Sequence, residues 1–391
     1  MDDFLLWKKA KPFFYMSSVA ATWIWAPAIF VSSDKAYNTG IPGFLMFLIP
    51  NVLTLVLFAF FAERVRNYRE GFTLGDVVEE AGIRQRYLHI TVSLTVLICS
   101  SCVQLIGLYT LFQAWYPISK QLSAFLISIC ALLMVWKDGI KGSIRTDAGK
   151  YVIMLVFGII LFLMSKNNPI WQGSSPIPTL DLFKAFGATT IIGLLAAPYA
   201  DQTFWQRVFS ISKERIRSVF FGSAFLFLLI PLIFGLIGFY APRYNNWVIT
   251  TTFSGAGIIM LSICVICALL STLDSNLCAI SSIVCSDFKQ PIQYGRYSMI
   301  VLLCFSSLLM ICTNLTITNL FLIYGTIRTC IALPTVLIIL NRYDKNRLFI
   351  GTCLSVLIAP LGYILSGGYW LFTVLALLIP IMGYSNNKET V

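Results

Sequence analysis

Long apolar runs, separated by short polar stretches, make up most of the chain. A helix that spans a bilayer needs about 20 mainly apolar residues. We therefore predict twelve membrane-spanning helices, at approximately 13–33, 42–62, 88–115, 121–136, 147–165, 184–206, 217–241, 252–286, 295–313, 317–340, 346–366 and 369–386. The run at 252–286 exceeds the thickness of a bilayer, so we expect it to extend into the cytoplasm or bend near its end. Since little chain remains between the spans, we expect residues 1–391 to form a single membrane domain.

The composition agrees with a polytopic membrane protein. Hydrophobic residues make up 58% of the chain and charged residues only 12%, whereas soluble domains carry about 25% charged residues. The formal net charge is +11, but the basic residues lie in alternate loops, which indicates membrane topology rather than a nucleic-acid partner. We expect a multi-pass protein of a plasma membrane or a bacterial inner membrane.

Basic residues gather before the first predicted span and in every second loop after it. They are Lys8, Lys9 and Lys11 before span one; Arg64, Arg66, Arg69, Arg84 and Arg86 after span two; Lys137, Lys141 and Arg145 after span four; Arg207, Lys213, Arg215 and Arg217 after span six; Lys289 and Arg296 after span eight; and Arg342, Lys345 and Arg347 after span ten. Cytoplasmic loops carry such an excess. We therefore expect both termini to be cytoplasmic.

The run at 252–286 contains an unusual concentration of polar residues, in the stretch A-L-L-S-T-L-D-S-N from Ala268 to Asn276. Polar and ionisable groups at membrane depth are costly, and they usually face a cavity or an ion pathway. The hydroxyls can instead bond to carbonyls of their own helix. Asp274 is not satisfied so easily, so the pattern favours a cation site.

Two of the predicted spans contain residues that interrupt helices. Pro27 lies in the middle of span one, and Gly193 and Pro198 precede Asp201 and Gln202 in span six. In secondary transporters, carbonyls freed by such breaks bind ions and solutes near the bilayer midplane. A simple proline kink is the alternative interpretation. The two breaks open the two halves of a possible inverted repeat.

The residues give no basis for an enzyme. The pairs Cys99 with Cys102 and Cys264 with Cys267 have CxxC spacing, but residues three apart on a membrane helix merely share a face, and cysteine packs well there. The chain has one histidine, His89, which is too few for a histidine-based metal or catalytic site. We expect no cofactor and no metal other than a coupling ion.

Four groups of residues, in order along the chain, resemble the sodium:solute symporter family. They are W-I-W-A-P with A-Y-N-T-G-I near the start, then G-S-I-R-T-D, D-Q-T-F-W-Q-R, and A-L-L-S-T-L-D-S-N followed by S-D-F. The resemblance implies an all-α LeuT-type fold of five plus five helices in inverted repeat, with repeats at 13–165 and 184–340 and two additional helices at 346–386. Some of these segments look most like the urea and polyamine branch of the family.

The resemblance also implies cation ligands. One sodium ion would be held by the carbonyls of Ala21, Ile24 and Ala268 and by the hydroxyls of Ser271 and Thr272. Some family members bind a second sodium ion at positions that correspond to Asp147, Ser271, Asp274 and Ser275. An all-oxygen, neutral shell suits a hard monovalent cation.

Lys150 departs from the family pattern, which often has glutamine three residues after the aspartate. The i, i+3 spacing puts Lys150 on the same helix face as Asp147. Our hypothesis is that its ammonium neutralises Asp147 or Asp274 and takes the place of a second ion. Alternatively, the Lys150 side chain reaches water at the membrane surface.

The LeuT-type fold implies a solute site beside the two breaks. Its candidate residues are Thr22, Trp23, Trp25, Gln104, Tyr199, Asp201, Gln202, Tyr324 and Arg328. An arginine inside a span needs a partner, so Arg328 binds either a solute carboxylate or an acid such as Asp201. A urea-like solute, an amino acid and a monocarboxylate all remain open.

The leading hypothesis is a sodium-coupled symporter that moves a small polar organic solute by alternating access. One alternative is a transporter-like membrane sensor or binding subunit that does not translocate its ligand. Another is a proton-coupled symporter, with Asp147, Asp274 or Asp201 as the proton carrier. The pair of Ser271 and Thr272 favours sodium.

Overall fold

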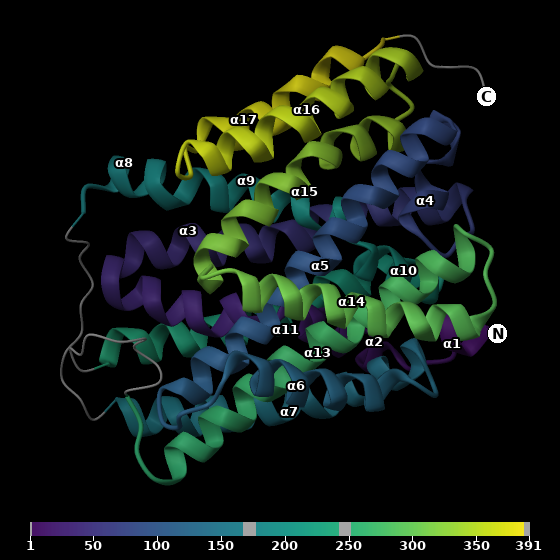
Figure 1. The fold of residues 1–391 in the computed structure, drawn as a ribbon. Coiled ribbons are helices and arrows are strands. Elements are labelled where there is room, and N and C mark those ends of the chain that lie inside the picture. The colour runs from purple at the N-terminus through teal and green to yellow at the C-terminus, as the bar shows by residue number, and fades with distance from the viewer. Residues whose placement is uncertain (1, 167–176, 242–251, 387–391) are drawn as a thin grey trace.

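A computed structural model describes residues 2–166, 177–241 and 252–386, and these residues form a bundle of helices (Figure 1). The longer helices are α2 (Pro12–Trp23), α3 (Ala26–Tyr68), α5 (Ile83–Gln113), α6 (Lys120–Val135), α7 (Ile140–Ser165), α9 (Ala188–Ala200), α10 (Gln202–Ser210), α11 (Ile216–Tyr240), α13 (Ala256–Ser286), α14 (Ile292–Cys312), α15 (Ile317–Ile339), α16 (Lys345–Leu365) and α17 (Leu371–Leu378). Short helical segments are α1 (Asp2–Leu5), α4 (Leu74–Val77), α8 (Thr179–Leu182), the π-helix η2 (Phe183–Gly187) and the 3₁₀-helices η1 (Glu79–Ala81), η3 (Lys213–Arg215) and η4 (Ile379–Gly383).

Within the described ranges, nine helical segments are long and apolar enough to cross a membrane. The difference from the twelve predicted spans has local causes. Helix α3 has 43 residues and joins the second half of predicted span one to span two across Gly40, whose φ of 62° breaks the helix. Helix α6 has 16 residues, and α17 continues into η4 from Leu371 to Gly383. Both are shorter than the roughly 20 residues that a spanning helix needs. The number of membrane crossings therefore stays a prediction.

The interruption predicted in the first span is confirmed. Helix α2 ends at Trp23, Ile24 and Trp25 are not helical, and α3 begins at Ala26. Pro27 lies in the first turn of α3, where a missing backbone N–H costs nothing because the first turn has no intrahelical acceptor for it. Pro27 thus begins the second segment rather than kinking a continuous helix.

The interruption in the sixth span lies at a different residue from those expected to cause it. Helix α9 runs through both Gly193 and Pro198 and ends at Ala200. Asp201 is extended, with φ −105° and ψ 114°, and its carboxylate accepts a hydrogen bond from the Thr203 backbone N–H at the start of α10. The break is therefore an aspartate N-cap.

Gly193 has a packing role instead. A Cβ atom at position 193 would lie 3.0 Å from the Gly325 Cα atom, so the glycine allows the backbones of α9 and α15 to approach closely. We expect Gly193→Ala to lower the free energy of unfolding by about 1–3 kcal/mol, because two packed backbones must separate. Gly149→Ala is the matched control, since among the described residues a Cβ there has no heavy atom of another segment within 4 Å. Denaturation of the detergent-solubilised protein measures both, and equal stabilities would contradict the role of Gly193.

Helix α13 forms the core of the bundle. Every residue from Ala268 to Ile283 is buried, and α13 packs against α2, α5, α7, α10 and α14. Helices α16 and α17 lie together at one edge, next to α15, while α6 and α7 lie at the opposite edge (Figure 1). The polar stretch of α13 therefore faces other helices on all sides, beside both interrupted segments.

Candidate functional site

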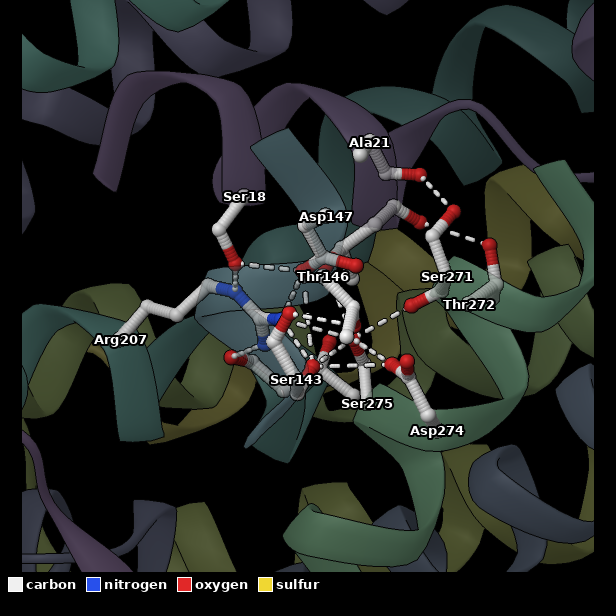
Figure 2. A network of polar contacts seen from close by, with 12 residues as sticks. Ser18, Ala21, Ser143, Thr146, Asp147, Arg207, Ser271, Thr272, Asp274 and Ser275 are labelled. Carbon is white, nitrogen blue, oxygen red and sulfur yellow. Dashed lines mark hydrogen bonds and ion pairs between the residues drawn. The ribbon is translucent and has the colours of Figure 1, made fainter. Parts of the chain in front are cut away.

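The end of α2 meets the middle of α13 through hydroxyl–carbonyl hydrogen bonds (Figure 2). The Ser271 hydroxyl donates to the carbonyl of Ala21 at 2.8 Å and to the carbonyl of Ala268 at 3.0 Å. The Thr272 hydroxyl donates to the carbonyl of Thr22 at 3.0 Å. Four of the five residues expected to bind a cation are thereby brought together, and Thr22 joins them.

Ile24, the fifth expected ligand, lies in the linker between α2 and α3, and its backbone N–H donates to the carbonyls of Ala20 and Ala21. The oxygens of this cluster are backbone carbonyls and neutral hydroxyls, all buried. Hard monovalent cations prefer oxygen ligands. The residues present therefore fit a sodium ion.

A second cluster, the charge cluster, lies one helical turn further along α13. It consists of Asp147 and Lys150 on α7, Asp274 on α13 and Arg207 on α10, all at most 6% exposed. The Lys150 ammonium is 3.2 Å from an Asp147 carboxylate oxygen and also contacts the Asp274 carboxylate. The Arg207 guanidinium is 3.4 Å from the other Asp147 oxygen. Two carboxylates thus face two fixed cations, and their formal charges cancel.

Serine hydroxyls complete the charge cluster. Ser18 donates to Asp147 at 2.7 Å, and Ser143 donates to Asp274 at 2.8 Å. Ser275 accepts from Arg207 at 2.6 Å. A buried ionic group is stable only when its hydrogen bonds are satisfied as well as its charge, and these hydroxyls supply the remaining partners.

Two hydrogen bonds connect the charge cluster to the first cluster, in which the α2 carbonyls meet Ser271 and Thr272. The hydroxyls of Thr22 and Ser275 share one at 2.9 Å, and Ser275 donates the other to the Ser271 carbonyl at 2.6 Å. The two groups of residues expected to bind one ion each are therefore neighbours in space.

Arg207 was interpreted from the sequence as a cytoplasmic loop charge, and that interpretation is wrong. The side chain is 1% exposed, and its guanidinium bonds the Thr203 carbonyl, the Ser18 hydroxyl and the Ser275 hydroxyl. Sequence reasoning missed it as a member of the charge cluster, as it missed Ser18 and Ser143. The available signal was its place four residues after Thr203, in the last turn of the short helix that Asp201 caps.

On the other side of Thr22 and Thr272, Asp201 and Arg328 form a buried ion pair of 2.9 Å. The second Asp201 oxygen accepts from the Thr203 backbone N–H and hydroxyl. The Arg328 guanidinium lies 4.2 Å from the Tyr324 ring centre and 5.4 Å from the Trp25 ring centre. The sequence left open whether Arg328 binds a solute carboxylate or an acid such as Asp201, and in the structure it pairs with Asp201.

The ion pair borders a small cavity at the junction of the two breaks. Its lining residues are Thr22, Trp23, Trp25, Ser100, Asp201, Thr203, Phe204, Thr272, Asn276 and Arg328. Its volume of about 10 Å³ is that of roughly one water molecule. The cavity contains Thr22, Trp23, Trp25, Asp201 and Arg328 from the expected solute site, and adds Ser100, Thr203, Phe204 and Asn276.

Gln104 and Tyr199 do not line this cavity. The Gln104 carbonyl oxygen accepts from the Ala26 backbone N–H at 3.0 Å, which satisfies a free donor at the start of α3. The Tyr199 ring packs edge-on against Phe58 and Phe61. Both side chains support the interrupted helices.

Gln202 and Tyr324 also lie outside the lining. The Gln202 amide bonds the backbone of Phe72 and Leu74, so it anchors the segment before α4. The face of the Tyr324 ring contacts the Arg328 guanidinium, and the ring meets Trp25 edge-on at a centroid distance of 5.5 Å. It positions two lining residues.

No protein-family model and no curated sequence matches the chain. Its structure is similar to a Na⁺-coupled sialic acid symporter in a substrate-bound outward-open state, with a TM-score of 0.79, 18% identity, and coverage of 98% of this chain and 91% of that one. It is similar to MhsT in complex with L-phenylalanine, with a TM-score of 0.65, 14% identity, and coverage of 95% and 99%. It is also similar to Mhp1, a nucleobase-cation-symport-1 family transporter, with bromovinylhydantoin bound, with a TM-score of 0.66, 14% identity, and coverage of 97% and 94%. The chain therefore has the all-helical LeuT-type fold, as the resemblance in its sequence implied.

Proposed function

We propose that this chain is a sodium-coupled symporter of a small polar organic solute, working by alternating access with both termini in the cytoplasm. The observation that carries the proposal is the contact of the α2 carbonyls with Ser271 and Thr272. It brings neutral oxygen atoms together at a helix break, beside a cavity with aromatic walls. The LeuT-type fold, shared with a Na⁺-coupled symporter, supports the same function.

Sodium is the coupling ion in this proposal because the carbonyl and hydroxyl ligands hold no titratable group. Proton coupling through Asp147 or Asp274 is less favoured, since each carboxylate contacts a fixed cation. The same contacts support a stoichiometry of one sodium ion per solute. The ammonium of Lys150 occupies the space between the carboxylates that a second ion would need.

The test is uptake of a panel of radiolabelled solutes into proteoliposomes, with and without an inward sodium gradient. We expect sodium-driven accumulation of at least one solute, and its loss in the double variant Ser271→Ala with Thr272→Ala, because two of the ion's ligands are removed. Ser262→Ala is the matched control on the same helix, since its hydroxyl, among the described residues, bonds the Ile258 carbonyl of α13 itself.

Three outcomes contradict the proposal in different ways. Accumulation that survives in the double variant would contradict the assignment of Ser271 and Thr272 as sodium ligands. Accumulation driven by a proton gradient alone would show that the coupling ion is a proton. Solute binding without accumulation under either gradient would make the chain a membrane sensor or binding subunit.

A further inference from the structure

Three side chains that line the central cavity have a buried polar atom without a hydrogen-bond partner among the described residues. These atoms are the indole Nε1 of Trp25, the guanidinium Nε of Arg328 and the amide oxygen of Asn276. Each side chain belongs to a residue that is at most 2% exposed. More than about 90% of buried polar groups in native proteins are paired. In the water-sized cavity of this structure one water molecule can pair with these groups, and in a wider state of the same site a solute takes its place.

These groups, together with the ion pair, give the cavity both hydrogen-bond donors and hydrogen-bond acceptors. Trp25 Nε1 and Arg328 Nε are donors, whereas the Asn276 oxygen and the Asp201 carboxylate are acceptors. The Asn276 amide nitrogen donates to the hydroxyls of Ser100 and Ser101, both at 3.1 Å, and its oxygen has no partner among the described residues. A ligand that satisfies both kinds of group needs an acceptor end and a donor end.

The charge around the cavity restricts the ligand further. Asp201 and Arg328 are the only charged residues among its described lining, and they are paired at 2.9 Å. A buried charge without a counter-charge is strongly unfavourable, so a solute of either net charge leaves one excess charge in the site. The sodium ion proposed for the neighbouring cluster adds its charge at the carbonyl end of α2, where the helix dipole is negative.

We propose that the transported solute is net-neutral and dipolar. Its acceptor end bonds Arg328 Nε and Trp25 Nε1, and its donor end bonds Asp201 and the Asn276 oxygen. Zwitterionic amino acids and neutral amides such as ureas share this chemistry, whereas monocarboxylates and polyamines do not. The walls of Trp23 and Phe204, whose rings meet edge-on at 5.2 Å, cover the apolar part of the solute. This assignment rests on the proposed function, since it names the solute of the same site.

The test is ligand binding to the purified protein in sodium chloride. Binding is measured by the fluorescence of the lining tryptophans and by competition in uptake. The probes are glycine, L-proline and L-phenylalanine as zwitterions, urea and acetamide as neutral amides, acetate as the anion, and putrescine and glycine methyl ester as cations. We expect at least one net-neutral probe to bind at least about tenfold more tightly than every charged probe. The zwitterion and amide arms distinguish the two sources of this chemistry.

Asn276→Ala supplies a second readout that leaves the ion pair intact. It removes one acceptor, so affinity for the preferred probe is expected to fall by about fivefold to tenfold, the effect of one hydrogen bond. Ser262→Ala, remote from the cavity lining, should leave that affinity unchanged.

The outcomes separate this inference from the proposed function. Tightest binding of acetate or putrescine, or no binding of any net-neutral probe, overturns the solute class. Sodium-driven uptake of acetate would overturn the class while supporting symport. Binding of a net-neutral probe that no ion gradient drives into vesicles would support the proposed solute class and contradict the proposed symport.

Discussion

Lys150→Met is expected to lower the free energy of unfolding by about 3–5 kcal/mol, which is the range for removal of one partner from a buried ion pair. The substitution leaves Asp147 and Asp274 buried beside each other, and Arg207, paired with Asp147, is the remaining cation of the charge cluster. Thermal and chemical denaturation in detergent measure the change. Lys213→Met is the matched control, because that lysine forms an exposed pair with Glu70 and its removal should cost less than about 1 kcal/mol.

Sodium distinguishes the proposed role of Lys150 from a purely structural one. If the ammonium takes the place of a second ion, Lys150→Gln should regain stability in sodium chloride relative to choline chloride at equal ionic strength, since sodium can then bind between the carboxylates. The sodium dependence of uptake should also become steeper, toward two ions per solute. Unchanged sodium affinity and an unchanged ratio of sodium to solute would contradict the hypothesis that Lys150 takes the place of a second ion.

The spacing of Lys150 and Asp147 predicted part of the charge cluster. Residues three apart share a helix face, and the structure has the two side chains 3.2 Å apart. The contact of Lys150 with Asp274 depends on how α7 packs against α13, which no spacing along one helix determines. Arg207 was missed for a related reason, because hydropathy does not separate a buried arginine at a helix end from a loop arginine.

The interrupted helices show the same division between local and tertiary information. Pro27 predicted the first break because proline removes a backbone donor. The second break was assigned to Gly193 and Pro198, whereas the local signal was the N-cap aspartate, Asp201. Which side chains line the cavity depends on helix rotation, so Gln104 and Tyr199 were included in the predicted solute site although each supports a helix instead.

Arg207→Lys is expected to abolish solute uptake while most of the protein still folds. The guanidinium joins α10 to three other helices through Ser18 on α2, Asp147 on α7 and Ser275 on α13. A lysine keeps the positive charge, but one ammonium cannot reproduce the planar fork. At least two hydrogen bonds to a charged group are lost, which lowers the free energy of unfolding by about 3 kcal/mol. The two interrupted helices then lose their fixed positions around the cavity.

Uptake per folded molecule, determined after size-exclusion chromatography, separates this effect from simple misfolding. Arg217→Lys is the matched control, since Arg217 pairs with Glu63 at the surface and should retain native uptake. Sodium binding to the Ser271 and Thr272 site should persist in Arg207→Lys, because neither hydroxyl contacts the guanidinium directly. Native uptake in Arg207→Lys would instead mean that charge alone suffices, and that the link between α10 and α2 plays no part in transport.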